Sequence, residues 1–222
     1  MILPRQKIYK FDIILFIKSI FNLDFFNDNK SIQQKLERKI TKFTKIKFCT
    51  LVPRGRVGLK IILNLIKQKN TKRDRVIMSP FTIFDIVNMV ISEKLKPDFC
   101  DINKNDFSIT LRELKKKINK NTLALILTHY HIEPLEYDKI VSYCKIKNIY
   151  LIEDRAIAFR KSDKKEKLNK NHFVIYSFGP FKFISTIDLG AIVTNSSYYY
   201  NKIYQYKKKF IYKNILLKLS KV

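Results

Sequence analysis

Segments with the hydrophobic pattern of strands alternate along this chain with segments that have the pattern of helices. This alternation limits the folds that the chain can adopt. Short apolar runs typical of strands are followed by stretches whose apolar residues recur at helical spacing. The run Thr122–Thr128 reads TLALILT, which indicates a strand covered on both faces. Strands that alternate with helices predict βαβ units, and therefore an α/β domain of three αβα layers around a mostly parallel sheet.

The predicted strands and helices follow one another without an internal repeat. Strands are predicted at Arg75–Met78, Asp98–Ile102, Thr122–Thr128, Ile149–Ile152, Phe173–Ser177 and Ala191–Thr194. Helices are predicted at Val57–Lys69, Phe84–Lys94, Leu111–Ile118, Tyr137–Lys147 and from Ser196 onward.

Residues that directly follow the strands are candidates for a site, because ligands of such sheets bind beyond the carboxyl ends of the strands. Four segments qualify: 79–82, 129–134, 153–155 and 178–182. We leave His129 and His131 out of the predicted site, since a histidine at a strand end is more often structural.

The net charge of +26, from 45 Lys and Arg against 19 Asp and Glu, invites a nucleic-acid interpretation. Lysine is spread along the whole chain, however, so we interpret the charge as a surface bias and expect no specific nucleic-acid site. The dense segment 198–221 is either an amphipathic helix on an anionic membrane or a surface helix packed on the body, and we favour the second.

The three cysteines are scattered, without C-x-x-C spacing, which argues against a disulfide framework or a zinc site. The N-terminal apolar run is broken by charges, and no apolar stretch approaches the roughly 18 residues of a membrane span. We therefore expect a cytoplasmic protein without a transmembrane segment.

The segment PRGRVGL at residues 53–59 opens a helix and holds two of the four glycines. Glycine permits a close backbone approach, and the N–H groups at a helix N-terminus bind anions. Arg54 or Arg56 can add a charge-assisted bond to a phosphate. The alternative is a glycine near an ordinary helix cap.

Two further features follow strands. Glu153 and Asp154 come after a buried strand, and one of them can hold a cationic ring nitrogen; alternatively, Asp154 caps a helix or pairs with Arg155. Lys182 lies in the segment SFGPFK, where desolvation would make it a better amine nucleophile. The alternative is one more surface lysine. A phosphate cradle, a carboxylate for a pyridinium and a nucleophilic lysine are together what pyridoxal phosphate needs.

From about Gln34 to about Asn195 the chain resembles the large domain of the DegT/DnrJ/StrS-type sugar aminotransferases, of pyridoxal-phosphate fold type I. PRGRVGL is similar to the family's G-T-x-A-L phosphate turn, and IEDRAIA to its i-E-D-x-A run. SFGPFKFISTIDLGAIVTN is similar to its S-F-x-x-x-K…T-G-E-G-G-x-x-x-T-N signature. Arg56 stands where the family has a threonine, and Ile83 where it has an aromatic residue that covers the cofactor.

The resemblance implies roles for individual residues. Lys182 would be the catalytic lysine that links to pyridoxal 5′-phosphate, and Asp154 would hold the ring nitrogen. Ser177 and the backbone of Gly55, Arg56 and Val57 would bind the phosphate.

The resemblance also implies an organisation and a function. We expect an N-terminal helical segment at 1–33, a cofactor-binding large domain at 34–195 and a basic C-terminal helix at 196–222, with the family's C-terminal small domain missing. A homodimeric aminotransferase would transfer an amino group from an amino acid to a nucleotide-linked keto sugar in surface polysaccharide or sugar biosynthesis. The alternative is a truncated or degenerate, non-catalytic relative with a binding or regulatory role.

Overall fold

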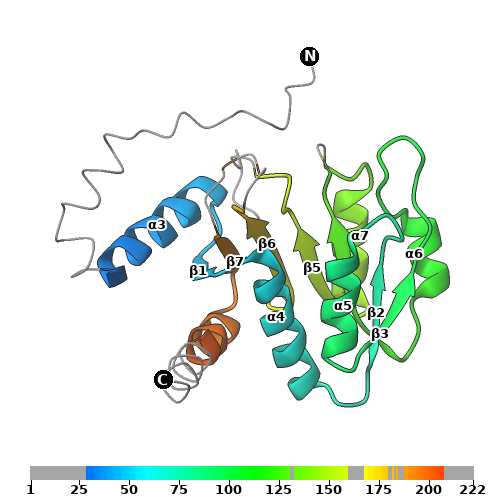
Figure 1. Cartoon of the computed structure of the whole chain (residues 1–222). Helices are drawn as coiled ribbons and strands as arrows, with labels where there is room; N and C mark the ends of the chain where they lie inside the picture. The colour runs from blue at the N-terminus through cyan, green and yellow to red at the C-terminus, as the bar shows by residue number, and fades with distance from the viewer. Residues whose placement is uncertain are drawn as a thin grey trace.

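A sheet lies at the centre of the computed structural model, which describes residues 29–130, 133–159, 168–179, 182, 184 and 188–207 (Figure 1). Within these residues its seven strands are β1 (Phe48–Val52), β2 (Arg75–Met78), β3 (Lys96–Phe99), β4 (Thr122–Thr128), β5 (Tyr150–Asp154), β6 (His172–Ser177) and β7 (Gly190–Thr194). Their spatial order is β1-β7-β6-β5-β4-β2-β3. The five strands from β6 to β3 run parallel, and β7 is antiparallel to both β6 and β1. The predicted mostly parallel α/β sheet is confirmed.

Helices cover both faces of the sheet. Their bounds are α3 (Asn29–Thr44), α4 (Gly55–Lys69), α5 (Phe84–Ser92), α6 (Leu111–Lys117) and α7 (Tyr137–Ile146), and residues 197–207 are also helical. One core joins α4, α5 and the 197–207 helix to one face of the sheet. Two further cores join α6 and α7, and separately α3, to the opposite face. This is the predicted three-layer arrangement.

The helical period of α4 explains how it packs. Leu59, Ile62, Leu63 and Ile66 recur on one side of the helix, and each is at most 1% exposed. The same face of the helix contacts β6 and β7. The N-terminus of α4 is thereby held against the end of the sheet where β6 finishes and β7 starts.

Several of the predicted element boundaries differ from those in the structure. The strand expected at 98–102 is β3, which begins two residues earlier and contains Pro97. Strand β3 lies at the edge of the sheet, and an edge strand accepts proline because one of its sides makes no hydrogen bonds to a neighbouring strand. The strand expected at 149–152 extends to Asp154, so both carboxylates belong to β5. The helix expected at 84–94 ends at Ser92, and Lys94 has a φ of 55°.

Two features at the N-terminal side were not predicted. Strand β1 joins the sheet through β7, which lies about 140 residues later in the chain, so no local pattern indicates the pairing. Helix α3 runs across the expected boundary at residue 34. The first 28 residues of the predicted N-terminal segment, and residues 208–222 of the basic C-terminal helix, lie outside the described residues.

Candidate active site

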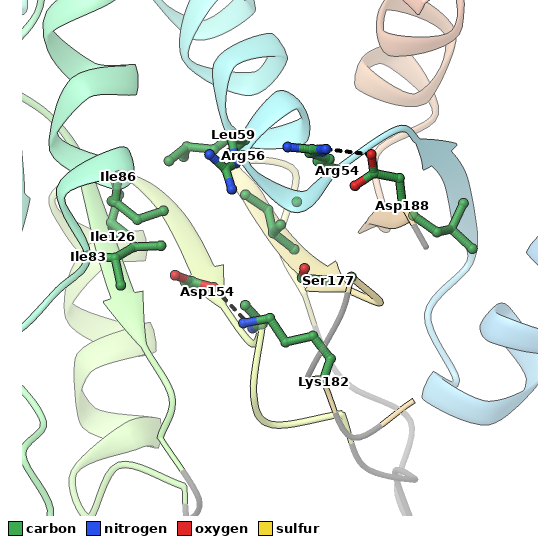
Figure 2. A pocket seen from close by; sticks show the side chains of 15 residues that line it. Arg54, Arg56, Leu59, Ile83, Ile86, Ile126, Asp154, Ser177, Lys182 and Asp188 are labelled. Carbon is green, nitrogen blue, oxygen red and sulfur yellow. Dashed lines mark hydrogen bonds and ion pairs between the residues drawn. The ribbon is translucent and has the colours of Figure 1, made fainter. Parts of the chain in front are cut away.

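A cavity of about 560 Å³ opens between the N-terminus of α4 and the carboxyl ends of β4, β5 and β6 (Figure 2). This is the edge of the sheet where ligands of parallel α/β folds bind. Its lining residues are Arg54, Gly55, Arg56, Leu59, Ile83, Ile86, Ile126, Asp154, Ala156, Ile175, Ser177, Gly179, Lys182, Asp188 and Leu189. The cavity thus combines an apolar wall of isoleucines with a small set of charged and hydroxyl groups.

The N-terminus of α4 forms one end of the cavity. Arg54 is the residue that precedes the helix, and its side chain makes no hydrogen bond that caps the first amides. A Cβ on Gly55 would lie 3.1 Å from Cβ of Ser177, so this glycine lets the helix start rest on the end of β6. Uncapped N–H groups beside a serine hydroxyl, at the positive end of a 15-residue helix, suit a phosphate.

Gly190 brings a second strand against the same turn. A Cβ on this residue would lie 2.6 Å from the amide nitrogen of Gly55 and 2.7 Å from the carbonyl carbon of Arg54. No side chain fits at that distance, so the first residue of β7 must be glycine for α4 to begin where it does.

Asp154 lies at the opposite end of the cavity, at the end of β5. Its Oδ1 atom accepts a hydrogen bond of 3.0 Å from the backbone N–H of Ala156. Its backbone carbonyl accepts another, of 2.9 Å, from the N–H of His129. Burial raises the pKa of Asp154, against the opposing effects of the Ala156 bond and of the charges of Lys182 and His129. The bond to Ala156 fixes the direction of the carboxylate.

Lys182 projects into the cavity from the loop after β6, toward Asp154 (Figure 2). Its backbone N–H donates to the carbonyl of Gly179 over 3.3 Å. Its positive charge stabilises the ionised form of Asp154. The carboxylate of Asp154 and the primary amine of Lys182 therefore line the same cavity.

Arginines flank the mouth of the cavity near α4. Arg54 pairs with Asp188 over 2.6 Å, and Arg56 pairs with Asp85 over 2.5 Å. All four side chains are 38–51% exposed, so these ion pairs contribute little to stability. They place two guanidinium groups where an incoming anion can exchange for a carboxylate.

The structure brings five of the six predicted site residues into this cavity: Gly55, Arg56, Asp154, Ser177 and Lys182. The sixth, Val57, does not line it, and its side chain packs against the core beside α4. The alternative pairing of Asp154 with Arg155 is wrong, because the guanidinium of Arg155 binds Glu153 over 2.7 Å. Ile83, at the position of the family's ring-covering aromatic residue, does line the cavity.

Sequence reasoning missed Asp188, Gly190 and the surroundings of Glu153. The first two lie in the TIDLG segment that aligns with the family signature, and that alignment was the available signal. No sequence signal indicated the partners of Glu153, since they come from four separate segments of the chain.

Comparisons with known proteins agree with the fold. The model of the DegT/DnrJ/EryC1/StrS aminotransferase family matches residues 12–214. A GDP-perosamine synthase of Escherichia coli O157:H7 is 27% identical over 175 residues, which cover 78% of this chain and 48% of that protein. The chain spans about half the length of the curated relatives that it matches.

Two solved structures share the fold. PseC of Helicobacter pylori, an aminotransferase involved in the biosynthesis of pseudaminic acid, superposes with a TM-score of 0.70 at 24% identity, over 77% of this chain and 46% of that one. NtdA of Bacillus subtilis, with bound cofactor PMP, gives 0.67 at 20% identity, over 77% and 38%. The family match covers nearly the whole chain, and the predicted family is confirmed: this chain belongs to the DegT/DnrJ/EryC1/StrS aminotransferase family.

Proposed function

We propose that this chain carries the cofactor-binding half of a pyridoxal-phosphate-dependent sugar aminotransferase. The observation that carries the proposal is that Asp154 and Lys182 line one cavity, which ends at the N-terminus of α4. The cavity volume of about 560 Å³ suits a small cofactor. Bound pyridoxal phosphate would supply an aldehyde for amino groups and a ring that takes up electron density from the reacting carbon.

The residues present fit this group. Ser177 and the first amides of α4 would hold its phosphate, and the close approach of Gly190 keeps those amides at the cavity. Asp154 would hold a proton on the ring nitrogen. Lys182 would bind the cofactor through Nζ, and the same amine would then take up and return the proton at the substrate carbon.

The substrates follow from the relatives. Among these are a GDP-perosamine synthase and a dTDP-4-amino-4,6-dideoxy-D-glucose transaminase, whose names specify nucleotide-linked amino sugars. We infer a nucleotide-linked keto sugar as the acceptor and an amino acid as the donor, in the cytoplasm. Among the described residues, no helix has the length and apolar character needed to cross a membrane.

A homodimer is part of this proposal. Phe81, Ile83, Phe84 and Phe107 are 48–75% exposed and form an apolar surface beside the cavity. Large exposed apolar groups that gather near a site mark an interaction surface. A second copy of the chain that covered this surface would also close the open side of the cavity.

The alternative is a relative that has lost catalysis. The specific observation in its favour is Ile83, whose branched side chain cannot stack on a ring as an aromatic residue does. Cofactor capture separates the two proposals, since a degenerate site has no reason to keep a reactive lysine beside Asp154.

The test is to add pyridoxal phosphate to the purified chain, record the absorbance of the bound cofactor, reduce with borohydride and map the labelled peptide. We expect the label on Lys182 and its loss in Lys182→Ala. Lys96→Ala is the matched control, because Lys96 is 75% exposed at the opposite end of the sheet. A label spread over surface lysines, with none on Lys182 at saturating cofactor, would refute the proposal.

A further inference from the structure

Glu153 and Asp154 are consecutive in β5 and therefore lie on opposite faces of the sheet. Asp154 pairs in register with Ile175 of β6, and both line the cavity on the α4 side. Glu153 pairs with Val174, which packs into the core on the other side. The site uses one carboxylate, and a second one is completely buried directly behind it.

The carboxylate of Glu153 is surrounded by donors from four segments. Its Oε2 atom accepts a hydrogen bond of 2.7 Å from Nε of Arg155 and forms an ion pair of 2.7 Å with Nη2 of the same residue. The same oxygen lies 2.8 Å from Nε2 of His129. Its Oε1 atom accepts a hydrogen bond of 2.8 Å from the hydroxyl of Tyr137 and contacts Nε2 of His172. The end of β4, helix α7, the residue after β5 and the start of β6 thus meet at one side chain.

This cluster is buried, and the carboxylate of Glu153 is ionised. Glu153, His129 and His172 have no exposed surface, and Arg155 is 2% exposed. Burial alone would raise the pKa of Glu153, but the charges of Arg155, His172 and His129 outweigh it and hold the pKa well below the ordinary value. Removing one charge of such a pair leaves the other buried without compensation, which is strongly unfavourable.

The ring of His129 is not aligned for a hydrogen bond with the carboxylate of Glu153. The Nε2 atom of His129 is close to the carboxylate but off the direction of a hydrogen bond, and Nδ1 of His129 has no hydrogen-bond partner among the described residues. A buried ring with poorly satisfied nitrogens is held by its surroundings at a cost. What it contributes is its backbone, whose N–H binds the carbonyl of Asp154 over 2.9 Å.

The residues that bind Glu153 also fix the backbone around Asp154. His129 donates to Asp154 from the β4 side, and the N–H of Arg155 donates over 2.9 Å to the carbonyl of Ile175 on the β6 side. The next residue, Ala156, donates to the Asp154 carboxylate itself. A displaced His129 or Arg155 therefore moves Asp154 in the cavity.

We propose that Glu153 is a positioning residue, which anchors His129 and Arg155 from the far face of the sheet and thereby fixes the direction of the Asp154 carboxylate. The use of that direction, to meet a ring nitrogen, rests on the proposed function. The positioning itself does not, because it concerns contacts within the protein. A functional group must be held to within about 0.5 Å, and packing and hydrogen bonds of the residues around it supply that precision.

The test measures amide hydrogen exchange by NMR in the full chain without cofactor. The N–H of Ala156 reports the direction of the Asp154 carboxylate, and the N–H of His129 reports the Asp154 backbone. The variant is Glu153→Gln, with Tyr137→Phe as a milder one that removes a single donor and no charge. Asp98→Asn is the control, because Asp98 is a buried carboxylate paired with Arg75 over 2.6 Å on the edge strand β3.

We expect both amides to exchange at least about tenfold faster in Glu153→Gln than in the control at equal global stability, since local opening is then easier. Tyr137→Phe should raise the two exchange rates by a smaller factor. If Glu153→Gln does not fold, the rates in Tyr137→Phe decide whether the proposal holds. Exchange within about twofold of the control in the folded variant overturns the proposal.

A second measurement uses the pyridoxal-phosphate complex. The pH midpoint of its absorbance band depends on the contact between the ring nitrogen and Asp154, so it shifts in Glu153→Gln and stays in place in Asp98→Asn. An equal shift in both variants would reduce Glu153 to a purely structural group. If the wild-type chain binds no cofactor, the proposed function fails while the exchange rates still decide the positioning.

Discussion

Asp154 and Lys182 share one cavity, and the charge of the lysine stabilises the carboxylate that burial disfavours. Burial is the larger effect, so the pKa of Asp154 is raised in the folded chain. The cavity therefore holds a carboxylate that stabilises the fold less when ionised than when protonated. The ionised carboxylate of Asp154 should therefore lower the stability of the protein while it favours binding of the cofactor, and a single substitution can separate the two effects.

Asp154→Asn should make the cofactor-free protein more stable at neutral pH. A carboxyl whose folded pKa is raised contributes stability below its unfolded pKa and loses it as pH rises through the folded value. The gain over wild type should thus grow from about pH 4 upward, as measured by urea unfolding at several pH values. The same variant should bind pyridoxal phosphate more weakly. A neutral-pH stability below that of the wild type would contradict the assignment.

Gly190→Ala should be destabilising by about 1–3 kcal/mol, because its Cβ has no room beside the backbone of Arg54 and Gly55. Gly179→Ala is the matched control: it lines the same cavity, but among the described residues its Cβ would meet only Oγ of Ser177, at 3.9 Å. Urea unfolding measures both. Equal losses of stability in the two variants would show that α4 does not depend on this approach.

Arg56→Ala and Asp85→Asn should change cofactor affinity in opposite directions. Arg56 is bound to Asp85 at the mouth of the cavity, so a phosphate and Asp85 compete for the same guanidinium. Loss of the arginine should raise the dissociation constant of pyridoxal phosphate about tenfold, as expected for a charge-assisted hydrogen bond. Loss of the aspartate should lower it. Titration followed by absorbance at low and high salt tests both signs; a change in the same direction would exclude a phosphate contact.

Phe84→Asp should convert a dimer to a monomer without unfolding it, because the side chain is 75% exposed and leaves the core untouched. Ile146→Asp is the control, since Ile146 is 77% exposed on α7 at the other face of the sheet. Sedimentation velocity distinguishes the two species. A wild-type chain that sediments as a monomer would remove the dimer from the proposal.

The sequence was informative wherever a pattern is local. Strand β4 was predicted with its observed bounds because both of its faces are buried and its seven residues form one apolar run. Helix α4 was recognisable from its buried stripe, and the segments that hold Asp154 and Lys182 followed from the rule that ligands bind beyond strand ends. Gly55, Arg56 and Val57 came from the glycine-containing helix start, and the role of Ser177 came from the resemblance to the family. These features depend on residues close together in the chain.

The features that escaped prediction depend on residues far apart. The antiparallel pairing of β1 with β7, the approach of Gly190 to Gly55 and the donors around Glu153 each join distant segments. Pro97 misled the prediction of β3, since a proline is as acceptable inside an edge strand as at its start. Of the two histidines left out of the predicted site, His129 is not among the residues that line the cavity, and His131 lies outside the described residues.

The place of β7 in the sheet has a consequence for the order of assembly. Strand β7 lies between β1 and β6, although β1 is the first strand and β7 the last within the part of the chain that the structure describes. A growing chain therefore holds β1 without a neighbour until some 190 residues have been made. The start of α4 shares this delay, because Gly190 is the backbone against which it rests. Such pairings of distant segments form slowly. The end of the cavity at α4, where we propose that a phosphate binds, is therefore completed only after β7 has been made.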